Sequence, residues 1–172
     1  MKNDSLTGLL NHASIKSRLA SETNRIVRHG GSLAVGMIDI DHFKQVNDTF
    51  GHANGDRILR ELAMLLRRRL RSSDTAGRYG GEEFVVLLPN TSLDAAVGLL
   101  DAIRDDFSQV SHFVGARELR VSFSGGVATL DNWPSSEAVL MAADAALYAA
   151  KKAGRNQIHK ARPHPAAANG GQ

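Results

Sequence analysis

Two short acidic stretches carry the side chains best suited to chemistry in this chain. Asp39 and Asp41 close an apolar run, and Glu82 and Glu83 follow the adjacent glycines at 80–81. Carboxylates that end a buried strand are costly unless they reach water, are paired or bind a cation. The residues therefore allow two interpretations: solvated ends of strands and turns, or carboxylates that face a cation or a substrate.

The glycines at 80–81 predict a tight hairpin. Two adjacent glycines supply the positive φ values that a two-residue turn requires, and the apolar run 84–88 then forms the outgoing strand. Because successive side chains of a strand point to opposite faces, Glu82 and Glu83 are expected to diverge. They would then have different partners instead of sharing one proton.

Segments with helical and strand-like periodicity alternate along the chain. The expected helices cover 12–29, 54–71, 92–107 and 135–152, with a short polar helix or turn at 42–50. The expected strands cover 33–40, 84–88 and 119–127, with an edge strand at 157–159. Glycines at 125–126 indicate a bulge or a close approach of backbone. Since a hairpin requires antiparallel pairing, the pattern predicts an α+β fold with a mixed or mainly antiparallel sheet covered by helices.

The composition is that of one globular domain. The chain has 172 residues, of which 42% are hydrophobic and 23% charged. It lacks cysteine, which excludes disulfides and thiolate metal sites and fits a cytoplasmic location, and no apolar run is long enough for direct membrane insertion. The net charge of +3 fits a polyanionic ligand such as a nucleotide, although solvated Lys and Arg give the same balance. We expect a domain at 1–160 and a flexible tail at 161–172.

Five segments, in order, resemble motifs of one family. They are Asp-Ser-Leu-Thr-Gly-Leu-Leu-Asn at 4–11, Asp-Ile-Asp-His-Phe-Lys at 39–44, the segment 47–56, Arg-Tyr-Gly-Gly-Glu-Glu-Phe at 78–84, and Ala-Leu-Tyr-Ala-Ala-Lys-Lys-Ala-Gly-Arg-Asn at 146–156. Together they resemble the GGDEF family, the bacterial diguanylate cyclases that make cyclic di-GMP from two GTP molecules. The resemblance runs from Asp4 to Ile158. It implies a nucleotidyl-cyclase or palm-like α/β sandwich with a central, mainly antiparallel five-stranded sheet flanked by helices.

The resemblance also implies a metal site. Asp39, Glu82 and the carbonyl of Ile40 match the positions that hold Mg²⁺ or Mn²⁺ in the family. Two carboxylates suit Mg²⁺, whose shell is commonly completed by substrate phosphates and water. Glu83 matches the position proposed to deprotonate the ribose 3′-hydroxyl. An unshifted glutamate is a poor base for a hydroxyl, so metal activation would do most of that work.

The GTP substrate is expected to contact a second group of matched residues. Asn47 and Asp56 match the residues that hold the guanine edge, where Asp56 accepts from the N1 and N2 donors. A negative charge favoured by a helix N-terminus is the alternative interpretation of Asp56. The remaining matches are phosphate-binding Lys44, Lys151 and Arg155, and pocket residues Phe43 and His52.

A separate product-inhibition site is implied by the Arg-x-x-Asp motif. Arg71 and Asp74 match that motif, and Arg78 is expected to join them in binding cyclic di-GMP. Ala102 falls near the position where some relatives carry a helpful second arginine. Inhibition would therefore be weak, or would need Arg104.

The resemblance implies a homodimer, because each subunit holds one GTP and the reaction joins two. An N-terminal sensory domain in a parent protein, which could be attached to a membrane, is expected as well. The alternatives are a catalytically inactive relative that senses GTP or cyclic di-GMP, a nucleotide-polymerising palm domain and an RNA-binding module. Only 5% of residues are aromatic, and no strand shows the stacking aromatics of RNA-binding modules, so no nucleic-acid partner is expected.

Overall fold

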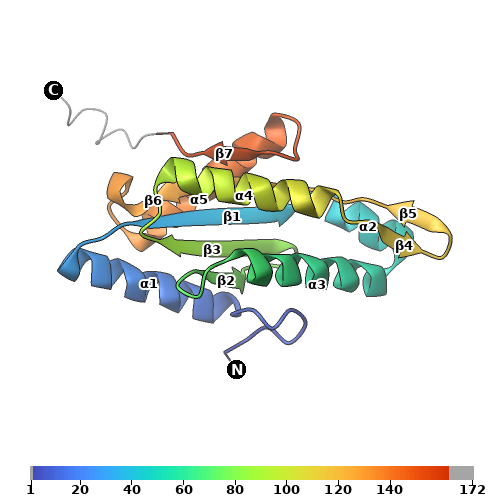
Figure 1. The fold of residues 1–172 in the computed structure, drawn as a ribbon, viewed down its shortest axis with the longest axis horizontal. Coiled ribbons are helices and arrows are strands. Elements are labelled where there is room, and N and C mark those ends of the chain that lie inside the picture. The colour runs from blue at the N-terminus through green and yellow to red at the C-terminus, as the bar shows by residue number, and fades with distance from the viewer. Residues whose placement is uncertain (1, 163–172) are drawn as a thin grey trace.

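The computed structural model describes residues 2–162 and contains one five-stranded sheet in the order β2-β3-β1-β6-β7 (Figure 1). Its strands are β1 (Leu33–Ile40), β2 (Thr75–Arg78), β3 (Glu83–Pro89), β6 (Phe123–Thr129) and β7 (Ile158–Lys160). β7 pairs in parallel with β6, whereas the other three pairings are antiparallel. This confirms the expected five-stranded sheet flanked by helices, with one parallel pairing at its edge.

Five α-helices surround the sheet. They are α1 (His12–His29), α2 (Phe43–Phe50), α3 (His52–Arg69), α4 (Leu93–Ser108) and α5 (Ser136–Lys152). α3 and α4 lie in front of the sheet in Figure 1, α5 lies behind it, and α2 extends beyond the end of β1. The core on one face draws on α2, α3 and α4, and the core on the other face draws on α1 and α5.

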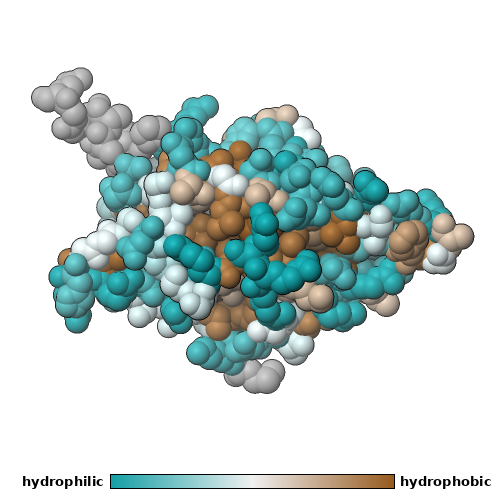
Figure 2. All heavy atoms as spheres, viewed as in Figure 1, coloured by the Kyte–Doolittle hydropathy of each residue, from teal (hydrophilic) through white to brown (hydrophobic). Residues whose placement is uncertain are grey.

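Amphipathic helices explain this arrangement. On α3 the apolar residues recur every three or four positions, and this face is buried against the sheet while the arginines at 67–69 end the helix. Figure 2 shows hydrophilic residues over the outer sides of α3 and α4, with hydrophobic atoms in the strip between them. β1 lies in the middle of the sheet and is buried at all eight positions, which holds its last residues rigidly.

The glycine turn differs from the prediction. Neither Gly80 nor Gly81 has a positive φ, and four residues, 79–82, connect β2 to β3. The backbone N–H groups of Tyr79 and Gly80 both donate to the carbonyl of Glu83, at 2.7 and 3.2 Å, so the turn is wider than a two-residue hairpin. A Cβ on Gly80 would lie 2.8 Å from the Glu83 carboxylate, so a larger residue there would displace the end of this side chain.

The glycines at 125–126 mark a close approach of backbone, one of the two outcomes expected from the sequence. Pairing with β1 continues through both residues without a bulge, and Gly126 lies opposite Met37. A Cβ on Gly126 would overlap the backbone of Ala143 and Leu147 in α5. The glycine therefore lets α5 pack directly on β6.

Two boundaries were wrong in the sequence-based prediction. α3 begins at His52, before the expected start at 54. The expected strand at 119–127 starts too early, because β6 begins at Phe123 and Leu119 instead ends β5 (Arg117–Leu119), which forms an unpredicted hairpin with β4 (His112–Val114). Strands of three residues carry too few positions for a periodic signal, and the left-handed Gly115 (φ 61°) makes their turn. No helix within the described residues 2–162 is long and apolar enough to cross a membrane.

Candidate active site at the end of β1

Asp39 is a mostly buried carboxylate with a single cationic partner. Its side chain lies at the end of β1, the residue is only 8% exposed, and its Oδ2 accepts from Lys151 Nζ at 2.6 Å. Burial raises the pKa of Asp39 above its ordinary value, Lys151 acts against that, and the charges of Glu82 and Asp41 raise the pKa further. A desolvated carboxylate held by one flexible ammonium group can exchange this partner for another cation.

The pairing of β1 with the hairpin brings Glu82 to the same end of the sheet. The backbone N–H of Ile40 donates to the carbonyl of Glu82 at 3.2 Å, and Asp39 lies directly opposite Glu83. Within residues 2–162 no group of three or more His, Asp or Glu side chains is arranged to hold a metal. The carboxylates of Asp39 and Glu82, with the Ile40 carbonyl beside them, fit instead an ion whose remaining ligands are phosphate and water.

Glu83 faces the α5 side of the sheet. It is half-buried and lines a hollow of about 540 Å³ together with Tyr79, Asp144 and Tyr148. Burial is the main cause that raises the pKa of Glu83, followed by the charges of Asp39 and Asp144. A raised pKa makes this carboxylate a stronger proton acceptor than an ordinary glutamate.

Asp41 has a different environment although it lies two residues from Asp39. Its Oδ1 accepts from Ser124 Oγ at 2.7 Å, and its Oδ2 accepts from Ser122 Oγ at 2.7 Å and from the Asn156 backbone N–H at 3.0 Å. Asp41 thereby ties β1 to β6 and to the loop after α5. The spacing of Asp39 and Asp41 along the chain does not predict this structural role.

The proposed guanine residues come together where α2 meets α3. Asn47 Oδ1 is buried and lacks a hydrogen-bond partner within the described residues. A Cβ on Gly55 would overlap this oxygen and lie 3.1 Å from Phe43 Cζ, so the glycine opens the space beside Asn47. Half-buried Asp56 is the fifth residue of α3, beyond the first turn, where the helix dipole gives it little stabilisation. An unpaired buried amide oxygen and a nearby carboxylate suit a ligand with hydrogen-bond donors.

The candidate phosphate-binding residues lie on separate elements around the same strand end. Lys44, at the start of α2, is exposed, as is the expected pocket residue His52 at the start of α3. Lys151 is in the last turn of α5, and Arg155 follows it in a left-handed conformation (φ 64°) with an exposed side chain. Of these residues, Lys151 brings its positive charge into direct contact with Asp39.

Arg71 and Asp74 form a preorganised pair away from this site. Arg71 Nη2 donates to Asp74 Oδ1 at 3.0 Å, to the Pro89 carbonyl at 3.1 Å and to Thr91 Oγ1 at 2.9 Å. The Asp74 side chain is fully buried, whereas that of Arg71 is 58% exposed. The hydrogen bond from Arg71 to Asp74 is the main cause that raises the Arg71 pKa. The guanidinium therefore presents a fixed and accessible edge.

Arg78 has partners other than this pair. Arg78 donates to both Asp4 carboxylate oxygens at 3.3 Å and to the Gly81 carbonyl at 2.9 Å. It lies at the other end of β2 from Asp74, about 13 Å away for four extended residues. The structure thus separates Arg78 from Arg71 and Asp74.

Arg104 also lies away from the Arg71–Asp74 pair. It bonds to Asp101 at 2.8 Å and to Asn156 at 2.7 Å, beside the β1 end of the sheet. Thr91, which Arg71 contacts, is 13 residues earlier, about 20 Å along the axis of α4. Ala102 leaves the pair without a second arginine on this helix.

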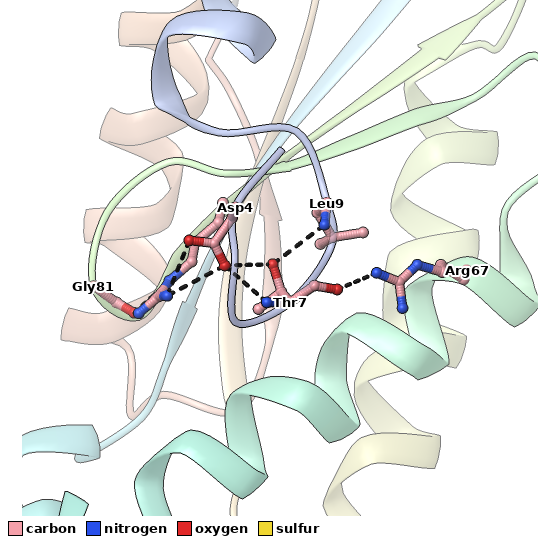
Figure 3. A network of polar contacts seen from close by, with 6 residues as sticks. Asp4, Thr7, Leu9, Arg67 and Gly81 are labelled. Carbon is pink, nitrogen blue, oxygen red and sulfur yellow. Dashed lines mark hydrogen bonds and ion pairs between the residues drawn. The ribbon is translucent and has the colours of Figure 1, made fainter. Parts of the chain in front are cut away.

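A polar network at the N-terminus had been missed from the sequence. Asp4 Oδ2 accepts from both the backbone N–H and the hydroxyl of Thr7 at 2.8 Å, and Arg67 donates to the Thr7 carbonyl (Figure 3). With Arg78, this network connects the opening turn to α3 and to the glycine turn. The arginine partners of Asp4 and Thr7 lie at least 60 residues away, so the spacing of residues along the chain carries no signal for this network.

A helix-flanked sheet whose central strand ends in carboxylates beside a glycine turn defines a domain of the nucleotidyl-cyclase class. Comparison with known families specifies it further, because the model described as "Diguanylate cyclase, GGDEF domain" matches residues 1–157. The chain belongs to the GGDEF family.

Relatives and solved structures agree with that assignment. The chain is 45% identical over 158 residues to diguanylate cyclase DgcP of Pseudomonas aeruginosa. The aligned region covers 92% of this chain and 24% of DgcP. It is 42% identical over 160 residues to response regulator PleD of Caulobacter vibrioides, and that alignment covers 90% of this chain and 35% of PleD. The chain thus spans about a quarter to a third of the length of these curated relatives.

Two solved structures have closely similar folds. The GGDEF domain of DgcB from Caulobacter crescentus, solved with c-di-GMP, superposes with a TM-score of 0.89 at 32% identity, covering 92% of this chain and 95% of that one. Diguanylate cyclase SiaD of Pseudomonas aeruginosa, solved with its activator SiaC, superposes with a TM-score of 0.88 at 43% identity. This superposition covers 92% of this chain and 61% of the SiaD chain.

Proposed function

We propose that this domain condenses two GTP molecules into cyclic di-GMP and releases two pyrophosphates. Each ribose 3′-oxygen attacks the α-phosphorus of the other GTP, a P–O bond forms, and the bond to the β-phosphate breaks. The observation that carries the proposal is the β1–β3 pairing, which brings Asp39 and Glu82 to one end of the sheet beside Lys151. The names of the relatives, among them diguanylate cyclase DgcP, support the same reaction.

Asp39, Glu82 and the Ile40 carbonyl would hold Mg²⁺ or Mn²⁺. When bound, such an ion neutralises triphosphate charge and polarises a phosphoryl oxygen. Lys151 would then leave Asp39 for a phosphate oxygen, since a lysine head group moves easily on its flexible stem. Lys44 and Arg155 would bind the remaining phosphate charge.

Asn47 and Asp56 would select guanine. Asp56 accepts from N1–H and N2–H, and Asn47 satisfies its buried oxygen by accepting from a ligand donor. Adenine offers no N1 donor, so it would leave a buried acceptor unpaired. Phe43 would form the apolar wall and His52 the exposed rim of the guanine pocket.

Glu83 would accept the proton of the 3′-hydroxyl. The reacting hydroxyl and phosphate belong to two nucleotides, each held by one chain, so turnover would require a homodimer that orients both. Relatives three to four times longer support a parent protein with a sensory segment before this domain, which would act in the cytoplasm where GTP is available.

Arg71 and Asp74 would bind the product and slow turnover. The exposed, fixed guanidinium suits a phosphate or a guanine edge. DgcB, whose GGDEF domain was solved with c-di-GMP, shows that a similar domain binds this molecule. Equal inhibition of wild type and Arg71→Ala by added cyclic di-GMP would refute this role.

The decisive experiment is product analysis. Purified protein incubated with GTP and Mg²⁺ is expected to yield cyclic di-GMP on chromatography, and Glu82→Ala is expected to yield none. Asp131→Ala serves as the control and should retain activity, because Asp131 is an exposed carboxylate that is not among the candidate site residues. A wild type that binds GTP without forming product would point to the sensor alternative.

A further inference from the structure

A groove beside α2 is not used by the proposed reaction. It has a volume of about 350 Å³ and runs between α2 and the segment 117–122. One end begins at Asp41 and His42, directly after β1. Val46 and Val121 form an apolar floor, so the polar groups stand on the two rims.

Both rims carry hydrogen-bond donors. Arg117 and Arg120 stand on one rim, and the Arg117 guanidinium lies over the ring of Phe50, 5.0 Å from its centroid. This contact limits the orientations that Arg117 samples. The other rim presents Gln45 and Thr49, four residues apart and therefore on the same side of α2.

The two carboxylates near these arginines are either bonded elsewhere or paired at an exposed position. Asp41 is the acidic residue in its wall, and both oxygens of Asp41 already accept hydrogen bonds from Ser122, Ser124 and the Asn156 backbone. Glu118 pairs with Arg120 at 3.4 Å, but the two side chains are 48% and 60% exposed. Exposed pairs of this kind contribute little, so an anion with several oxygens can displace Glu118.

The groove and the guanine pocket lie on opposite sides of α2. Asn47 contacts Gly55 of α3, whereas Gln45 and Thr49 face the segment 117–122. The two sites meet only near the end of β1, where the phosphates of a bound nucleotide would lie. At this end the groove is lined by Asp41 and His42, the residues that directly follow β1.

We propose that the groove binds pyrophosphate, the leaving group of the proposed reaction. This inference rests on the proposed function, since that reaction supplies the ligand at the end of β1. Six peripheral phosphate oxygens can bridge the arginines of one rim and the donors of the other, which a single orthophosphate spans less well. Only binding is involved, and no covalent bond forms or breaks.

Calorimetric titration of the full chain with sodium pyrophosphate in EDTA tests the proposal without metal or turnover. Binding is expected in the wild type and should weaken at least about tenfold in Arg117→Ala/Arg120→Ala. The control Arg28→Ala/Arg60→Ala removes the same charge from exposed positions and should stay within about twofold of wild type. Equal affinity in wild type and the groove variant, or equal loss in the control, would overturn the proposal.

Two further arms locate the ligand and guard against misfolding. Lys151→Ala/Arg155→Ala should retain pyrophosphate binding, and loss in that variant would assign the anion to the candidate active site instead. Arg120→Gln keeps the Arg117–Phe50 contact and should still weaken binding, with an unchanged thermal midpoint. Orthophosphate should bind at least about tenfold more weakly than pyrophosphate, and equal binding would contradict a bridged diphosphate.

The outcome separates the groove from the cyclase reaction. Titration that succeeds while product analysis fails would sustain the anion site and reject the reaction. Formation of cyclic di-GMP, together with equal pyrophosphate affinity in wild type and Arg117→Ala/Arg120→Ala, would sustain the reaction and reject the anion site.

Discussion

Asp39 and Asp41 stand two residues apart at the end of one strand, and both are more than nine-tenths buried, yet their partners differ. Asp41 accepts three hydrogen bonds from two serines and a backbone N–H. Within residues 2–162, the carboxylate of Asp39 instead pairs with the ammonium group of Lys151. The comparison shows that burial alone does not mark a ligand site. What distinguishes Asp39 is that its partner is mobile and can be replaced.

The largest expected effect separates the two aspartates by activity. Asp39→Asn should lower the rate of cyclic di-GMP formation about a thousandfold, because it removes the proposed charge against the metal and triphosphate. Pyrophosphate release under saturating GTP measures this. Asp131→Asn is the control, and an Asp39→Asn enzyme within a few-fold of wild type would end the proposed metal role.

The second effect separates them by stability. Asp41→Ala leaves the hydroxyls of Ser122 and Ser124 without their shared acceptor and should lower the free energy of unfolding by about 3 kcal/mol. Urea denaturation gives this value. If Asp39→Ala costs as much as Asp41→Ala, the two carboxylates do not differ in structural role.

A smaller effect is expected from the partner of Asp39. Lys151→Gln removes the cation that lowers the pKa of Asp39 while burial remains, so that pKa should rise further in the metal-free protein. The carboxyl chemical shift followed by NMR titration measures it. The rate constant kcat/KM for GTP should also fall about tenfold, since a phosphate contact is lost. Lys152→Gln, one residue on, should change neither quantity.

The smallest effect is a pH dependence of stability. The pKa of Asp39 is raised above its ordinary value of 3.8, so the folded state binds more protons than the unfolded chain between the two values. Through this carboxyl group, the free energy of unfolding of the protein therefore falls as pH rises through that window. Asp39→Asn removes the loss, so its thermal midpoint relative to wild type should increase as pH rises from about 4 to about 7 without metal. A difference that stays flat or reverses would mean that Lys151 compensates the buried charge fully.

Long elements were predictable because each carries many residues with one periodicity. The helix at 12–29 and the strand at 33–40 have the predicted bounds, and the apolar stripe of α3 is buried as expected. The hairpin at 112–119 was missed because three-residue strands carry almost no periodic signal. The glycine turn was predicted as too tight, because the hydrogen bonds that widen it involve Glu83, which local propensity does not consider.

The candidate site was predictable as a list of residues but not as an arrangement. The ordered motifs identified Asp39, Glu82, Asn47 and Asp56 as candidates, and their roles stay predictions. The partners of Arg78 could not be inferred in this way. Asp4 lies 74 residues away along the chain, and nothing in the spacing connects the two residues.

The sequence by itself determined the helices and main strands, the family and the candidate residues, because periodicity, turn chemistry and ordered motifs are local properties of the chain. Only the tertiary structure decided which of the two aspartates is held by Ser122, Ser124 and Asn156 and which faces Lys151. It also separated Arg78 from Arg71 and formed the groove beneath Arg117. These outcomes depend on side chains brought together from distant segments, and hydrogen bonds and burial act through space and not along the chain.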